Sequence, residues 1–244
     1  MIKFYPACAN LDEGERIYAI GDIHGRADRL MEIYDQIAGD LEARPVRNAT
    51  IVDLGDYIDR GPDSAAVLEL MISPPSRLKG VRRVPLIGNH EALCLRAFDG
   101  DVRAETHWLE NGGNDCLRSW NLKRETWRAM APPEHIGFMR GLALTHIQGD
   151  YLFVHAGIRP MIAIEEQKPH DLIWIREPFL DYNGPHPYVV VHGHTPESMA
   201  PTVRYNRIGI DTGAAYGGPL TCLILEDDRI GFFSSERDIC GELV

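Results

Sequence analysis

The chain has 244 residues, of which 44% are hydrophobic and 25% charged, and these values exclude a disordered or low-complexity protein. The length fits one large domain or two small ones, and we expect a single domain over residues 1–244. Asp and Glu outnumber Lys and Arg by 36 to 25, so the net charge of -11 argues against a nucleic acid or an anionic membrane as the main partner.

Short apolar runs that stop at a glycine recur in the first part of the chain and predict buried strands. The runs cover residues 16–20, 50–54 and 84–87. Between them, apolar residues at helical spacing predict helices over Ala27–Ala43 and residues 64–71. This alternation of strand and helix predicts a mostly parallel sheet that is covered on both faces.

The middle of the chain, about residues 90–141, has helical patterns separated by Gly112-Gly113 and Pro132-Pro133, which predicts an inserted helical cap. Three further strands are predicted over residues 151–154, 188–191 and 207–210. The last two apolar runs, residues 220–225 and 229–233, are separated by an acidic turn and predict a closing hairpin.

Residues with metal-ligand chemistry gather directly after the predicted strands. They lie in the segments Gly21-Asp22-Ile23-His24-Gly25, Gly55-Asp56-Tyr57-Ile58-Asp59-Arg60-Gly61, Gly88-Asn89-His90-Glu91, His155-Ala156-Gly157 and His192-Gly193-His194-Thr195. Ligands bind at the carboxyl ends of strands in open α/β sheets, so we expect these side chains to converge. Carboxylate, amide and imidazole donors suit Mn, Fe or Zn. Asp56 is the natural bridge between two such ions, which together would support in-line displacement at phosphorus.

These five motifs, in this order from about residue 21 to residue 213, resemble those of the PPP group of serine/threonine protein phosphatases, within the calcineurin-like metallophosphoesterases. The resemblance is closest to the bacterial members. It implies an α/β fold with two packed mixed β-sheets flanked by helices, and with the helical cap as an insertion.

The resemblance also implies a role for each motif residue. It makes Asp22 and His24 ligands of one divalent metal ion, Asp56 a bridge, and Asn89, His155 and His194 ligands of a second ion. Mn is the expected metal, with Fe or Zn as alternatives. His90 matches the general acid, oriented by Asp59, and Arg60 and Arg176 match phosphate-binding arginines.

The implied activity is a phosphomonoesterase that hydrolyses phosphoserine or phosphothreonine in proteins through attack by a hydroxide that bridges the metals. A phosphoprotein or phosphopeptide is then the partner. The first alternative is a symmetrical dinucleoside tetraphosphatase, but those enzymes usually lack a carboxylate at the position of Asp59. The second alternative, a non-catalytic scaffold with this fold, predicts missing ligands, whereas all six are present here.

Other conspicuous residues lie outside the predicted ligand set. His192 is next but one to His194 and should point to the opposite side of an extended segment, so we expect a structural role. Asp211 is expected to shape the floor of the site through hydrogen bonds. Three tryptophans are expected to pack inside the helical cap rather than contact substrate; they are Trp108, Trp120 and Trp127. The segment Asn111-Gly112-Gly113 resembles a recurrent bacterial segment, with no role evident from the sequence.

The five cysteines are scattered and form no C-x-x-C pair, which favours a reducing compartment. Residues 1–10 hold too short an apolar stretch for a secretory signal, and no segment approaches the roughly 18 apolar residues that span a bilayer. We therefore expect a cytoplasmic location, and as a separate expectation a monomer.

Overall fold

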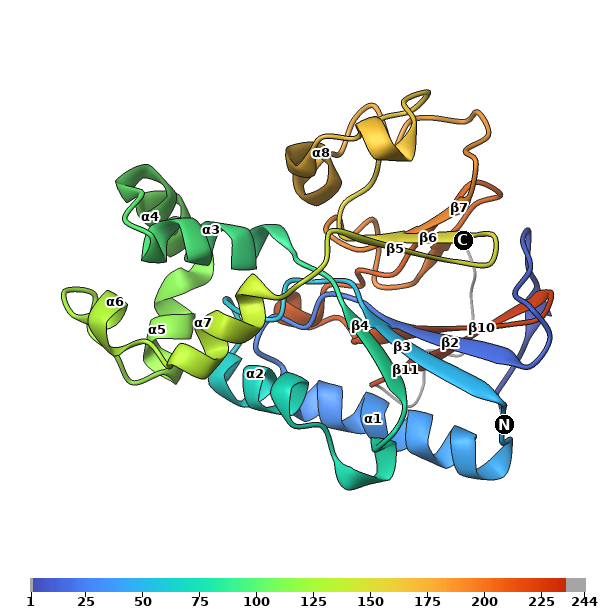
Figure 1. Cartoon of the computed structure of the whole chain (residues 1–244), viewed down its shortest axis with the longest axis horizontal. Helices are drawn as coiled ribbons and strands as arrows, with labels where there is room; N and C mark the ends of the chain where they lie inside the picture. The colour runs from blue at the N-terminus through green and yellow to red at the C-terminus, as the bar shows by residue number, and fades with distance from the viewer. Residues whose placement is uncertain (1, 236–244) are drawn as a thin grey trace.

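The structure is a computed structural model that describes residues 2–235 and contains two β-sheets (Figure 1). The strands of the first sheet are β1 (Tyr5–Pro6), β2 (Glu15–Ile20), β3 (Asn48–Asp53), β4 (Arg82–Pro85), β10 (Thr221–Glu226) and β11 (Arg229–Ser234). Those of the second are β5 (Thr145–Gln148), β6 (Tyr151–Val154), β7 (Val189–His192), β8 (Thr202–Val203) and β9 (Arg207–Gly209). Their spatial orders are β1-β11-β10-β2-β3-β4 and β5-β6-β7-β9-β8.

Both sheets are mixed, so the prediction of a mostly parallel sheet was correct for only part of each sheet. The parallel pairs lie only within β2-β3-β4 and within β6-β7-β9. The predicted hairpin of β10 and β11 is confirmed, and it adds antiparallel strands because β10 pairs with β2 in the opposite direction. The two mixed sheets implied by the family resemblance are therefore confirmed.

Helices lie on the outer sides of the two sheets and in the predicted insertion (Figure 1). The first sheet is covered by α1 (Ala27–Ala43) and α2 (Ser64–Ile72), and the second by α8 (Pro169–Trp174). The helical cap comprises α3 (Asn89–Phe98), α4 (Val102–Trp108), α5 (Asn114–Ser119), α6 (Trp127–Met130) and α7 (Pro133–Arg140). A wide turn, Leu109–Gly113, joins α4 to α5.

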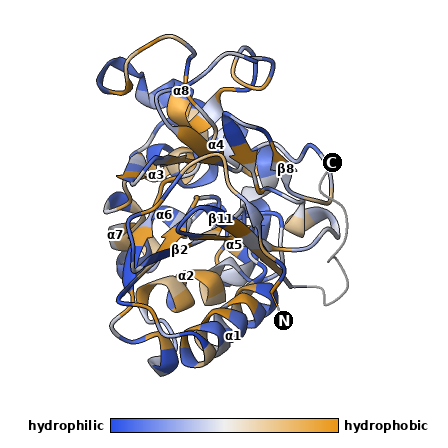
Figure 2. Ribbon diagram, turned by 90° about the vertical axis from the view of Figure 1, so that its right-hand side faces the viewer, coloured by the Kyte–Doolittle hydropathy of each residue, from blue (hydrophilic) through white to orange (hydrophobic). Residues whose placement is uncertain are grey.

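Alternating side chains of each strand fill separate core layers. On β2, Tyr18 and Ile20 pack toward α1 and α2, whereas Ile17 packs between the sheets. On β6, Phe153 faces the layer between the sheets and Leu152 the layer under α8. In Figure 2, hydrophobic residues lie on the strands and also on α8, while α1 carries hydrophilic as well as hydrophobic positions. Because both faces of both sheets are covered, the polar residues that could bind a ligand lie in the loops at the ends of the strands.

The described part of the chain contains no helix with the length and apolar character needed to cross a bilayer. Its cysteines are free thiols: Cys8, Cys94, Cys116 and Cys222. The fifth, Cys240, lies outside the described residues.

Candidate metal centre

The structure brings all six predicted metal ligands to one end of the two sheets. They follow β2, β3 and β4 of the first sheet and β6 and β7 of the second, and each is at most 9% exposed; they are Asp22, His24, Asp56, Asn89, His155 and His194. The two sheets are connected at this point, because the backbone N–H of His194 donates to Asp22 Oδ2 at 3.0 Å. The carboxyl ends of the parallel strands therefore meet as expected.

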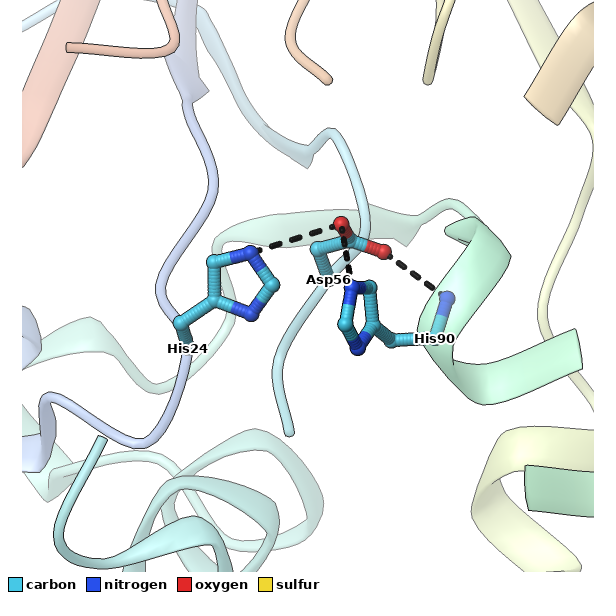
Figure 3. Close-up of side chains that lie close together, drawn as sticks. All are labelled: His24, Asp56 and His90. Carbon is cyan, nitrogen blue, oxygen red and sulfur yellow. Dashed lines mark hydrogen bonds and ion pairs between the residues drawn. The ribbon is translucent and has the colours of Figure 1, made fainter. Parts of the chain in front are cut away.

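Asp56 lies at the centre of the cluster. Its Oδ2 is 3.5 Å from Nε2 of His24 and 3.9 Å from Nε2 of His90. Figure 3 shows the two imidazoles directed toward this carboxylate. Its other oxygen, Oδ1, is 3.4 Å from Nε2 of His155. Burial alone would raise the pKa of Asp56, but the imidazoles of His155, His90 and His24 hold that pKa below its ordinary value. The carboxylate is therefore ionised. It is shared by two groups of donors, one with His24 and His90 and the other with His155 and His194.

The ring orientations of His24 and His155 are fixed by backbone carbonyls. Nδ1 of His24 is 2.8 Å from the carbonyl of Ile58, and Nδ1 of His155 is 2.8 Å from that of Leu54. A carbonyl accepts only, so each Nδ1 carries the proton and each Nε2 presents a lone pair. Burial lowers the pKa of His24 to about 3 and also lowers that of His155, so both rings are neutral near pH 7. Neutral, carbonyl-oriented imidazoles are suited to metal ligation.

The second group of donors converges on Asn89. Its Oδ1 lies 3.0 Å from Nε2 of His155 and 2.9 Å from Nδ1 of His194. Because Nε2 of His155 presents a lone pair, it faces two acceptors, Oδ1 of Asn89 and Oδ1 of Asp56. Buried acceptors that face one another are unfavourable unless a cation lies between them. The donor set therefore fits a metal ion.

Asp22 lies at the edge of the cluster, close to a further carboxylate. Burial, followed by the negative charges of Asp211 and Asp56, raises the pKa of Asp22 well above its ordinary value. Burial also raises the pKa of Asp211 to about 6, and the carboxylate of Asp211 accepts the N–H of Gly213 at 3.0 Å. Three carboxylates gathered in a buried site are the kind of charge that divalent cations balance. Asp211 thus makes a hydrogen bond to Gly213, and its expected role in shaping the floor of the site stays a prediction.

His90 and Asp59 form a fully buried pair beside the predicted metal ligands. Nδ1 of His90 is 2.7 Å from Oδ2 of Asp59, and the opposite nitrogen, Nε2, has no hydrogen-bond partner in the described structure. Burial would lower the pKa of His90, but the charge of Asp56 and the hydrogen bond and charge of Asp59 raise it. The ring can therefore hold a proton on the nitrogen that faces the site.

Glu91 supports the site in a way that the sequence motifs did not predict. Its carboxylate accepts four backbone N–H groups, from Gly88, Asp56, Tyr57 and Ile58, at 2.8 to 3.2 Å. It thereby fixes the loop after β3 against the start of α3. The signal available in the sequence was an acidic residue in the first turn of a helix, which by itself indicates only capping.

The two predicted phosphate-binding arginines occupy different surroundings. Nη1 of Arg60 lies 2.7 Å from Nε2 of His24 and can donate to its lone pair, and the guanidinium lies over the ring of Tyr216 at 5.5 Å. Arg176 is exposed, and burial together with the charges of His155 and Arg176 lowers the pKa of His194 to about 3. Arg60 is thus within the cluster and Arg176 at its border.

Backbone strain is concentrated in these loops. Eight non-glycine residues of the described chain have positive φ, and five of them belong to the predicted site; they are His24, Asp56, Asp59, Arg60 and His194. Such conformations cost free energy and persist where the surroundings enforce them, which is typical of functional sites. Sequence patterns gave no indication of them.

The residues expected to be structural are accounted for in the same way. His192 turns away from the cluster, and its Nε2 accepts from Arg207 Nη1 at 3.2 Å. Trp120 and Trp127 pack in the core of the helical cap, as predicted. Trp108 packs there too, but its indole N–H also donates to Asp59. Gly112 lies against Arg60, and Gly113 lies against the ring of Trp108. The Asn111-Gly112-Gly113 segment therefore has a packing role.

Known proteins resemble this chain in sequence and in fold. Residues 15–228 match a family model described as calcineurin-like phosphoesterase. The serine/threonine-protein phosphatase 1 of Salmonella typhimurium is 32% identical over 225 residues, which cover 84% of this chain and 89% of that protein. The symmetrical bis(5'-nucleosyl)-tetraphosphatase of an Acidovorax strain is 32% identical over 150 residues, 62% of this chain but only 47% of that protein. A cold-active protein-tyrosine phosphatase of a Shewanella species superposes with a TM-score of 0.60 at 18% identity, over 94% of this chain and 84% of that one.

Proposed function

The chain belongs to the calcineurin-like phosphoesterase family, and we propose that it is a PPP-type phosphomonoesterase that hydrolyses phosphoserine and phosphothreonine in proteins. The observation that carries this proposal is the buried pair of Asp59 and His90, 2.7 Å apart. A serine or threonine alkoxide leaves poorly unless it is protonated, whereas a nucleoside diphosphate leaves as a stable anion. A proton donor held by a buried carboxylate therefore favours an alcohol as the leaving group.

We assign two divalent cations to the donors around Asp56, with Mn as the proposed metal. Asp22 and His24 would hold one ion, Asn89, His155 and His194 the other, and Asp56 would contact both. This assignment is supported by the lone pairs that face one another around Asn89 and Asp56. Once bound, such ions lower the pKa of water and neutralise charge on a phosphoryl group.

The remaining residues would bind the phosphoryl group and move a proton. Arg60 now lies on Nε2 of His24, so a cation at that nitrogen would displace the guanidinium and free it for the phosphoryl oxygens. Arg176, at the border of the cluster beside Thr195, would supply a second guanidinium to the phosphoryl oxygens. His90 would donate its Nε2 proton to the leaving oxygen as the P–O bond breaks, and Asp59 would keep Nδ1 oriented.

A symmetrical dinucleoside tetraphosphatase is the second candidate, and aromatic rings beside the cluster favour it. Trp174 stacks on the exposed His107, with 5.5 Å between ring centroids, and meets His194 edge-on at 6.1 Å. Tyr216, beside Arg60, is 63% exposed. Exposed rings near a phosphate-binding site can stack on nucleobases. The Acidovorax relative carries the name of this activity.

A substrate panel with added Mn separates these candidates. Phosphoserine and phosphothreonine peptides, p-nitrophenyl phosphate and diadenosine tetraphosphate are compared at equal enzyme concentration. Hydrolysis of both phosphopeptides is expected, with a loss of activity in His90→Asn that is much larger on the phosphopeptides than on the aryl ester. Rapid formation of two ADP without phosphopeptide hydrolysis would reverse the ranking. A protein that binds no metal and hydrolyses nothing would be a scaffold.

A further inference from the structure

The indole of Trp108 contacts both carboxylate oxygens of Asp59, including Oδ2, which Nδ1 of His90 also contacts. Trp108 is the last residue of α4, is fully buried, and donates from Nε1 to Oδ1 and Oδ2 of Asp59 at 3.0 and 2.9 Å. Asp59 is itself fully buried. Its carboxylate is therefore held by an imidazole from α3 and by an indole from the end of α4, 49 residues away in sequence.

The packing around the indole leaves it little freedom. A Cβ built on Gly113 would lie only 2.6 Å from Cδ2 of Trp108, so the wide turn after α4 rests directly on the ring. Trp127 also packs against the ring in a tilted arrangement, with 4.8 Å between ring centroids. The same turn also reaches the next residue of the site loop, because the backbone N–H of Arg60 donates to the carbonyl of Gly112 at 3.4 Å. Residues from the cap thus hold the site loop at two successive positions.

We propose that Trp108 is a positioning residue for proton transfer, an inference that rests on the function proposed for His90. The indole N–H fixes the carboxylate of Asp59, the carboxylate holds Nδ1–H of His90, and Nε2 is thereby aimed at the leaving oxygen. In the reaction the proton on Nε2 passes to the leaving oxygen as the P–O bond breaks. The Nδ1 proton stays with His90, and Trp108 neither gives nor receives a proton.

The test compares Trp108→Phe with Trp127→Phe, both in the full-length chain. Trp127 is a matched control because it is equally buried in the same cap and donates from Nε1 to a carboxylate outside the site, that of Glu105, at 2.9 Å. We expect Trp108→Phe to lower kcat on a phosphoserine peptide by about 10- to 100-fold, a part of what a general acid contributes. On p-nitrophenyl phosphate, whose leaving group hardly needs a proton, kcat should change little. Equal losses on both substrates, or no loss, would overturn the inference.

A second variant and a second measurement keep the test decisive. Replacing Trp108 by benzothienylalanine retains the shape of the ring and removes only the N–H, so it tests the hydrogen bond without a cavity. In the metal-free protein the Nδ1 proton of His90, assigned by its loss in His90→Asn, is followed by NMR. Its resonance should shift in both Trp108 variants and stay in Trp127→Phe. An unchanged resonance would overturn the inference, whether or not the protein hydrolyses a phosphoester. A protein that hydrolyses no phosphoester but shows the shifted resonance would reject the proposed function and leave the hydrogen-bonded placement of His90 in force.

Discussion

The backbone N–H of Asp56 donates to Oε2 of Glu91 at 2.9 Å, so the central carboxylate of the cluster is placed by a second, buried carboxylate. Glu91 accepts three further backbone N–H groups. Its replacement should therefore affect both the fold and the site.

We expect Glu91→Gln to lower the free energy of unfolding by about 2–5 kcal/mol, because the amide nitrogen would face backbone donors and leave at least one of them unsatisfied. Urea denaturation measures this change. The matched control is Glu69→Gln, because the Glu69 side chain is 61% exposed and its carboxylate contacts a single side chain of the described residues, His135. A similar small effect in both variants would contradict the role given to Glu91.

Metal binding should stabilise the folded protein. Saturating Mn, at about 100 times its dissociation constant, should add roughly 2.7 kcal/mol for one ion and raise Tm accordingly. Asp56→Asn should remove most of this gain and lower the metal content per chain, because both groups of donors share Asp56. Calorimetry and elemental analysis measure the two effects. Asp228→Asn, in the exposed turn of the hairpin, should retain the response to Mn.

The wide turn of the cap should not tolerate a side chain. Gly113→Ala places a methyl group 2.6 Å from Cδ2 of Trp108, and we expect it to destabilise the protein by about 1–3 kcal/mol. At Gly137, inside α7, no described atom outside the adjacent residues and the backbone of the helix lies within 4 Å of where a Cβ would be, so Gly137→Ala should stabilise by about 0.5–1 kcal/mol. Thermal unfolding of the two variants should therefore give shifts of opposite sign, and shifts of the same sign would contradict the packing.

An ion-pair network at the far end of β2 should contribute to acid sensitivity. Burial would raise the pKa of Glu226, but hydrogen bonds from Arg16 and Arg44 outweigh it and lower that pKa below 4.5. A depressed folded-state pKa contributes stability above the unfolded-state pKa, and this stability is lost as the pH falls through the folded-state value. Glu226→Gln should therefore be less stable near pH 7 and lose less stability on acidification below about pH 5. The free energy of unfolding of both proteins is measured by denaturation across this pH range. A difference between the two proteins that is the same at every pH would contradict the role given to Glu226.

Much of the fold could be predicted because its signals are local. The helix Ala27–Ala43 was predicted at its observed bounds, since its apolar stripe is formed by neighbouring turns. The run predicted over residues 84–87 is shifted, because β4 ends at Pro85 and Leu86 instead bridges to Ala143. Short edge strands such as β1, β5 and β8 were not predicted, since two to four residues become a strand only through the partner they meet.

The site could likewise be predicted where its signals are local and not where they depend on tertiary packing. The gathering of the predicted metal ligands could be predicted because each lies shortly after a predicted strand, although β4 ends two residues before the end of the run predicted ahead of Asn89. The contact of Trp108 with Asp59 and the placement of Arg60 on His24 could not be predicted, because both join segments 36 or more residues apart whose approach depends on tertiary packing.

The donors around Asp56 come from both sheets of the sandwich: Asp22, Asp56 and Asn89 follow strands of the first, and His155 and His194 follow strands of the second. A bound cation would consequently act as a crosslink between the two halves, in addition to any role in chemistry. Separation of the halves and release of the ion would then be a single event. The lifetime of the folded chain would depend on how slowly the ion dissociates, and chelators would accelerate unfolding without touching the hydrophobic layers.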